Sequence, residues 1–220
     1  MNPTTEEYKK QAIIDELAWD DSVNANDVTV TVYDGKVELN GTVPTYAAKT
    51  AAERDAYIAS DMTTVINNLK VKFPATKAVP TDAEISTSIK NKLKWNSQIN
   101  DTGIKVETTH GLVTMSGIVD TYWEKNLAED IALFTDGVVD VINDLEVTPV
   151  KSLVDIDIEN DIKNTFARRN IDETMINVSV QGGIVTLTGT ASNYLEKSKA
   201  HNIAMYTAGV RDVINDIVIV

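Results

Sequence analysis

The feature that most constrains how this chain can fold is a threefold internal repeat. Three segments end in nearly the same pentapeptide, written VINNL at 65–69, VINDL at 141–145 and VINDI at 213–217. Upstream of each pentapeptide, two glycines six residues apart and a tyrosine five residues further on recur without a gap. They are Gly35, Gly41 and Tyr46, then Gly111, Gly117 and Tyr122, then Gly183, Gly189 and Tyr194. The spacing predicts three copies of one unit, at 1–73, 74–150 and 151–220, called here modules 1, 2 and 3.

Each module is predicted to contain a helix, two strands, a second helix and a last strand, in that order. In module 2, Ile85, Ile89 and Leu93 recur every four residues, which indicates the buried face of a helix. Runs in which apolar and polar residues alternate, such as 176–180, indicate half-buried strands. These patterns predict an α+β protein.

Short signals mark where the first helices begin. Thr81 and Glu84 have the spacing of a capping box, in which each side chain satisfies a free backbone amide of the other residue. Thr4 and Glu7 repeat this spacing in module 1, and Asp155 is the candidate cap in module 3. Each first helix is therefore expected to begin at a side-chain cap.

The segments YDGK, THGL and QGGI separate the two strands of each predicted hairpin. Each ends its two central residues with glycine, which favours a type I′ turn because both central residues need a positive φ. The second glycine of each module, such as Gly117, is expected to let the backbone leave the sheet or pack closely against the next helix. Asp61 stands where a glycine ends the second helix in modules 2 and 3.

An asparagine occupies the third position of each closing pentapeptide. Asn67, Asn143 and Asn215 are expected to lie where the second helix meets the last strand. Their side-chain amides are expected to bond to neighbouring backbone there, which would be a structural role. Contact with a ligand is the less favoured alternative.

The arrangement resembles that of the BON domain, a family named for bacterial OsmY and nodulation proteins. The pattern is V.V..G.V.L.G.V, a helix of spaced alanines and GV..V.N.L.V, and it stands in module 2 as 104–147. The resemblance implies three tandem αββαβ modules, each with two helices on one face of a three-stranded mixed sheet. It also implies a link to osmotic or envelope stress, and anionic phospholipid binding has been proposed for the domain.

Composition excludes several classes of function. The formal net charge of −13 repels phosphate backbones, so we expect no nucleic-acid partner. No apolar run is long enough for a membrane span, and no secretory signal is visible. We therefore expect a cytoplasmic protein, or a periplasmic one if an export signal has been removed.

No motif in the chain predicts an enzyme, a cofactor or a metal site. Nucleophile elbows, P-loops and dinucleotide fingerprints are missing from the sequence, and it contains no cysteine. His110 and His201 have no second histidine nearby, so a surface or packing role is favoured for both.

Seven residues are candidates for contact with a lipid or a protein partner. Five are basic and lie in the predicted helices of module 3: Lys163, Arg168, Arg169, Lys197 and Lys199. If they converge they could bind anionic phospholipid, and ordinary solvated charge is the alternative. Trp19 and Trp95 end the first helices of modules 1 and 2, where we expect them to cover a core or a seam between modules. The alternative for them is an interfacial contact.

These observations predict a non-enzymatic interaction or scaffold protein that acts by binding a protein partner or by self-association. Binding of anionic phospholipid through module 3 is the alternative, and protection of other proteins under osmotic stress is a weaker one. Because a module of this size buries little surface by itself, the modules are also expected to pack together or to dimerise.

Overall fold

The computed structural model describes residues 5–60, 64–149, 153–172 and 174–220. Module 1 contains α1 (Thr5–Trp19), β1 (Val28–Tyr33), β2 (Lys36–Val43), α2 (Tyr46–Ser60) and β3 (Thr64–Val71). Module 2 contains α3 (Asp82–Trp95), β4 (Ile104–Thr109), β5 (Leu112–Val119), α4 (Tyr122–Leu133) and β6 (Asp140–Val147). Module 3 contains α5 (Asp155–Arg168), β7 (Ile176–Gln181), β8 (Ile184–Ala191), α6 (Tyr194–Met205) and β9 (Asp212–Ile219). The predicted α+β order is confirmed in all three modules.

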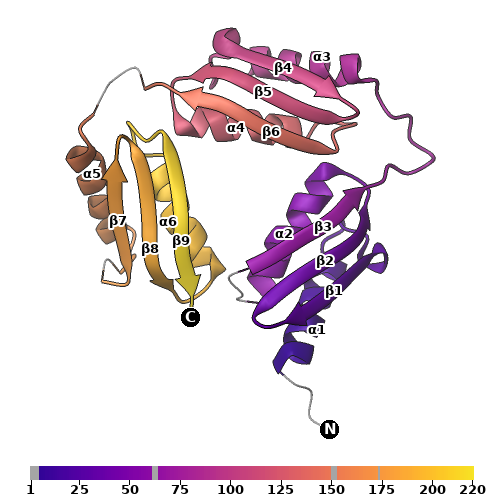
Figure 1. Ribbon diagram of the computed structural model, residues 1–220, viewed down its shortest axis with the longest axis horizontal. Helices are drawn as coiled ribbons and strands as arrows, with labels where there is room; N and C mark the ends of the chain where they lie inside the picture. The colour runs from indigo at the N-terminus through magenta and orange to yellow at the C-terminus, as the bar shows by residue number, and fades with distance from the viewer. Residues whose placement is uncertain (1–4, 61–63, 150–152, 173) are drawn as a thin grey trace.

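Each module has a three-stranded mixed sheet with the middle strand in the centre of the order. In module 2 the order is β4-β5-β6, with β4 and β5 antiparallel and β5 and β6 parallel. The hairpin turns have a positive φ at both central residues, for example 53° at His110 and 76° at Gly111, as the type I′ prediction requires. Both helices cover one face of the sheet, which confirms the predicted fold (Figure 1).

The second repeated glycine of each module has a different role from the one expected. Gly117 lies inside β5 with φ 122°, and a Cβ there would stand 1.9 Å from the carbonyl oxygen of Gly103. Gly41 and Gly189 have equivalent close approaches to Asp27 and Met175. The glycine therefore lets the segment before the first strand cross the middle strand, and the next helix is not involved.

Side-chain hydrogen bonds fix where the first helices begin. The Thr81–Glu84 capping box is present, as predicted. Asp155 does not cap α5, whose N-cap is Val154, so that prediction is wrong. Its carboxylate instead accepts hydrogen bonds from the amides of Gly182 at 2.7 Å and Gly183 at 2.9 Å, which ties the helix to the hairpin. Asp82 binds the hairpin of module 2 in the same way. Thr4 and Asp61 lie outside the described residues.

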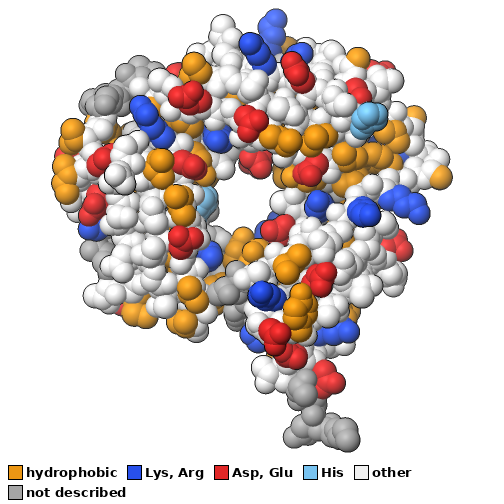
Figure 2. Space-filling model, in the orientation of Figure 1, with side chains coloured by type: hydrophobic (Ala, Val, Ile, Leu, Met, Phe, Trp, Pro, Cys, Tyr) orange, Lys and Arg blue, Asp and Glu red, His pale blue; other side chains and the backbone are white. Residues whose placement is uncertain are grey.

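The three modules form a ring. In Figure 1 the sheets face the viewer, the helices lie behind them, and module 3 returns to lie beside module 1. The space-filling view shows an opening through the centre (Figure 2). The second helices α2, α4 and α6 lie nearest to this opening. The expectation that the modules pack together is confirmed.

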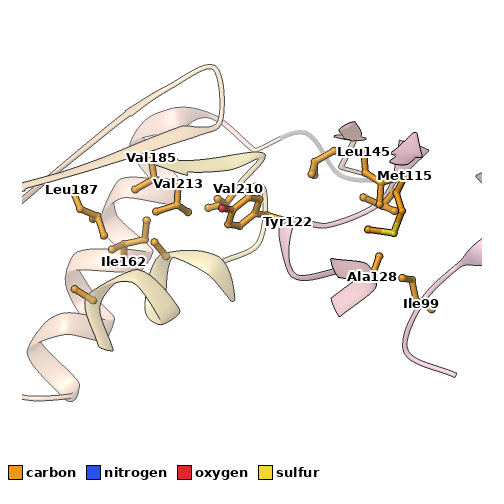
Figure 3. Close-up of a cluster of buried hydrophobic side chains, with 14 of the residues drawn as sticks. Ile99, Met115, Tyr122, Ala128, Leu145, Ile162, Val185, Leu187, Val210 and Val213 are labelled. Carbon is orange, nitrogen blue, oxygen red and sulfur yellow. The ribbon is translucent and has the colours of Figure 1, made fainter. Parts of the chain in front are cut away.

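The buried side chains form two clusters. One belongs to module 1 and includes Ile13, Leu39 and Leu69. The other runs through modules 2 and 3 without a break, because Tyr122 of module 2 packs beside Val210 and Val213 of module 3 (Figure 3).

Candidate interaction surfaces

The three asparagines tie the last strand of each module to its second helix. Asn143 Nδ2 donates to the carbonyl oxygen of Lys125 at 2.9 Å and to Glu129 Oε2 at 3.0 Å. Its Oδ1 accepts from the amide of Leu145 at 3.4 Å. Asn67 makes the same three bonds in module 1. These asparagines lie inside the strand, three residues after its start, and their amides are engaged within the module.

Modules 2 and 3 carry an open groove between their two helices. The groove of module 2, between α3 and α4, has a volume of about 690 Å³ and includes Trp95, Leu127, Ile131 and Phe134. The Trp95 and Phe134 side chains are 83% and 70% exposed. Lys92 spans the groove and donates from Nζ to the Phe134 carbonyl at 3.0 Å and to Thr135 Oγ1 at 2.8 Å. The groove thus presents two large aromatic side chains to solvent.

The groove of module 3 lies between α5 and α6 and has a volume of about 540 Å³. Leu195, Ile203 and Tyr206 contribute apolar surface, and Arg169 and Lys199 contribute positive charge. Within the described part of the chain, no acidic side chain lines this groove. This groove is therefore apolar and basic, whereas that of module 2 is apolar and includes Asp130.

One ion pair, between Arg54 and Asp20, bridges the corresponding helices of module 1. Arg54 of α2 lies 3.4 Å from Asp20, just after α1, and 3.1 Å from Asp55. In module 2 the repeat places Asp130, Asn96 and Ile131 at these positions, so the same bridge cannot form. The repeat therefore keeps the helix pair but varies what lies between the helices.

The expectation that both tryptophans cover a core or a seam is wrong. Trp19 is 82% exposed, and Trp95 is exposed on the edge of its groove. Both indoles follow the last buried residue of their helix, and the core beneath is already filled by Leu17 and Leu93. Periodicity identified the buried stripe but could not show whether a further side chain covered it.

The basic residues of module 3 do not all meet on one surface. Lys199 Nζ donates to the Arg169 carbonyl at 2.6 Å, which brings these two residues together across the α5–α6 groove. Arg168 bonds to Thr165 on its own helix, and Lys163 pairs with Glu159. Lys197 lies on the other side of α6, where its Nζ donates to the carbonyl of Ile217 at 2.8 Å.

The repeated tyrosine opens each second helix and contacts the next module. Tyr46 of module 1 meets Asp140 and Val141 at the start of β6, and burial together with the Asp140 carboxylate raises the pKa of Tyr46 to about 12. Tyr122 of module 2 meets Asp212 and Val213 at the start of β9, and burial raises its pKa as well. The tyrosines therefore act as joints between successive modules.

The third joint closes the ring between modules that are not adjacent in the chain. Tyr194 of module 3 stacks on Tyr57 of module 1, with ring centroids 5.2 Å apart and planes 9° from parallel. Tyr57 in turn accepts a hydrogen bond from the amide of Val65 at 3.4 Å. Val65 is equivalent to Val141 and Val213, the strand residues that Tyr46 and Tyr122 contact in the other two joints. In the third joint Tyr57 makes this contact, and Tyr194 packs on Tyr57.

The two histidines have different surroundings. His110 is exposed in the hairpin turn of module 2, with its backbone amide bound to Asp82. His201 lies on α6, edge-on to Tyr122 with centroids 6.5 Å apart, and burial lowers its pKa. Among the residues that the structure describes, no group of three or more His, Cys, Asp or Glu side chains could hold a metal ion.

None of the helices within the described ranges is long and apolar enough to cross a membrane. Charged residues interrupt each of them at short intervals, as in α5, DIDIENDIKNTFAR.

Comparison with known proteins finds the same repeat. The family model described as BON domain matches residues 7–72, 81–149 and 155–220. The chain is 28% identical over 143 residues to the Osmotically-inducible protein Y of Escherichia coli (strain K12), covering 62% of this chain and 71% of that protein. It is 32% identical over 116 residues to the 21 kDa hemolysin of Actinobacillus pleuropneumoniae, covering 52% and 59%. A solved structure of CdsD, a structural protein of the type III secretion system of Chlamydia trachomatis, is 18% identical with a TM-score of 0.28, covering 96% of this chain and 91% of that one.

Proposed function

Because the chain belongs to the BON-domain family, with three modules that span most of its length, we propose that it is a non-enzymatic interaction protein. It works by binding a protein partner through the open helix-pair groove of module 2. The similarity to the Osmotically-inducible protein Y supports a link to osmotic stress.

The exposure of Trp95 and Phe134 on one groove is the observation that supports this function best. Large aromatic side chains dominate the energetics of protein interfaces because each buries a large area with few rotatable bonds. Trp95 and Phe134 expose most of their surface in the free chain, and Leu127 and Ile131 extend the apolar surface between them. A partner that presents an apolar segment would remove this surface from water.

Site-specific photo-crosslinking tests the proposal directly. A photoreactive amino acid placed at Trp95 should give one defined crosslinked product in cells at raised osmolarity. The matched control is the same amino acid at Trp19, which is equally exposed but lies where the Arg54–Asp20 ion pair bridges the helices. If position 95 yields no product, or the same products as position 19, the groove is not the interaction site. A product that contains two copies of this chain would identify self-association as the mechanism.

Binding of anionic phospholipid through module 3 is the second candidate. It is supported by the contact between Arg169 and Lys199 beside the apolar residues of the α5–α6 groove. Each basic residue near an anionic membrane contributes about 1 kcal/mol, so a small cluster gives weak, salt-dependent attachment.

Co-sedimentation with phosphatidylglycerol vesicles and with neutral vesicles separates this candidate from the first. Arg168→Glu/Arg169→Glu should abolish binding to the anionic vesicles. The control, Lys90→Glu/Lys94→Glu on α3, makes the same change in net charge on module 2 and should retain binding. Equal loss in both variants would mean that net charge, and not module 3, governs attachment, and the wild type remaining in the supernatant would rule the candidate out.

A further inference from the structure

We propose that the joint between modules 1 and 3 is a binding site for a small anion that carries carboxylate or phosphate oxygens. The site is a cavity of about 500 Å³ between α2 and α6. It shares no lining residue with the groove of module 2, and it adjoins the α5–α6 groove, with which it shares Leu195, Ser198 and Asn202. Three basic side chains line it: Arg54 from module 1, and Lys197 and His201 from module 3. None of the described residues that line it is acidic, although the chain carries a net charge of −13.

The repeat shows that His201 replaces an acid. Its equivalents in modules 1 and 2 are Glu53 and Glu129, and each of those carboxylates accepts a hydrogen bond from the strand asparagine. In module 3 the asparagine is Asn215, whose Nδ2 has only the carbonyl of Lys197 as a partner among the described residues, at 3.4 Å. Asn215 also lines the cavity. The change from glutamate to histidine therefore removes a negative charge and leaves an amide donor weakly bonded at the cavity.

Module 1 contributes a second charge change to the same joint. Arg54 occupies the position of Asp130 in module 2 and Asn202 in module 3. Its guanidinium binds Asp20 and Asp55, yet 55% of its side chain remains accessible. A planar guanidinium has donors for more than two partners, so it can bind an anion while it keeps these ion pairs.

Lys197 is the third donor. Among the residues that the structure describes it forms no ion pair, and its Nζ has one carbonyl partner, that of Ile217. Burial lowers its pKa, although the Asp216 carboxylate opposes this effect. An ammonium that is partly removed from water and has no ion-pair partner is stabilised when an anion enters beside it.

The position of the cavity gives the anion a structural consequence. Its donors come from the first and the last module, which otherwise meet through the stacked Tyr57 and Tyr194 rings. An anion bound to both sides would therefore hold the ring closed. The volume lies in the range of small-molecule sites, so a compact metabolite fits and a folded macromolecule does not.

Titration calorimetry of the full chain with inorganic phosphate and with citrate, at constant ionic strength set with chloride, tests the site. One saturable anion per chain is expected, and the stronger of the two ligands identifies phosphate or carboxylate chemistry. His201→Glu restores the residue of the other modules and should weaken binding about tenfold or more, which is at least about 1.4 kcal/mol. Because glutamate is accommodated at this position twice in the chain, the variant should keep its circular dichroism and melting temperature.

Two further comparisons complete the test. Lys197→Gln should weaken binding, whereas Lys125→Gln at the equivalent position of module 2 should not. Binding of phosphatidylglycerol vesicles should fall much less in His201→Glu than in Arg168→Glu/Arg169→Glu, since Arg169 lines the α5–α6 groove and His201 does not. Equal affinity in the wild type and in His201→Glu, or heats no greater than those of added chloride, would overturn the proposal. Neither result would bear on the crosslinking test of the module 2 groove.

Discussion

At the scale of single residues, the strand asparagine is repeated in every module, but its side chain does not form equally strong hydrogen bonds in each. Asn143 bonds to a helix carbonyl, a carboxylate and a strand amide. Asn215 lacks the carboxylate partner and bonds at 3.4 Å and 3.3 Å to the other two groups. Because hydrogen bonds weaken with distance and those to charged groups are stronger, the two asparagines should differ in their contribution to stability.

We therefore expect Asn143→Ala to lower the free energy of unfolding by about 1–3 kcal/mol, and Asn215→Ala to lower it by less. Urea denaturation followed by circular dichroism measures both variants in one background. Modules 2 and 3 share a continuous core, so both substitutions report on connected structure. Equal losses would contradict the bonding difference.

Asp55 of module 1 is a charged residue at a position that is apolar in the other two modules. It is 4% exposed, and its Oδ2 has no hydrogen-bond partner among the described residues. Burial raises its pKa, and the ion pair with Arg54 only partly opposes this effect. The equivalent residues in modules 2 and 3 are Ile131 and Ile203.

Asp55→Ile should raise the free energy of unfolding at neutral pH by about 1–3 kcal/mol, since a buried unsatisfied group is removed. The sign of the pH dependence follows from the raised pKa. The folded state holds the Asp55 proton more tightly than the unfolded state, so the wild type loses stability as the pH rises through the raised pKa. The advantage of the variant in thermal unfolding should therefore shrink toward acid pH, and an advantage that grows in acid would show that the ion pair outweighs burial.

At the scale of secondary-structure elements, glycine is required for two different reasons. Gly182 has φ 61° in the hairpin turn, and an added Cβ would meet nothing within 4 Å. Gly117 has φ 122° inside a strand, and an added Cβ would overlap the Gly103 carbonyl. The first position requires only an unusual φ, whereas the second also requires empty space.

Gly182→Ala should cost about 1 kcal/mol, the usual penalty for a left-handed residue with a Cβ. Gly117→Ala should cost several times more, because the crossing segment must move or β5 must break its register. Comparing the two melting temperatures checks this order. If the two variants melt together, the close approach at Gly103 does not constrain the module.

The helices and hairpins could be predicted because they depend on contacts inside one repeat, whereas the three-stranded mixed sheet was implied by the family resemblance. The Ile85–Leu93 stripe, the type I′ turns and the Thr81 cap are all local signals, and the structure has each of them. Asp155 could not be assigned from its spacing, because its partners are hairpin amides far along the chain. The exposure of Trp95 depends on the separation of two helices, which no periodicity encodes.

At the scale of the whole molecule, the repeated tyrosine links sequence to assembly. Its spacing marked it as part of the module, but its partners lie in the next module, at Asp140 for Tyr46 and Asp212 for Tyr122. The same tyrosine contact forms the first two joints, and a different contact, the stack of Tyr194 on Tyr57, closes the ring. Both the anion site and the placement of the second helices around the opening depend on that closure.

Small-angle X-ray scattering of the full chain measures closure most directly. The wild type should scatter as a compact ring with the maximum dimension of the structure. Tyr194→Ala, which removes the stack on Tyr57 but leaves both covalent linkers, should increase the radius of gyration without loss of secondary structure. A wild-type curve that already fits an extended row of modules, unchanged by Tyr194→Ala, would contradict the ring and the joint site with it.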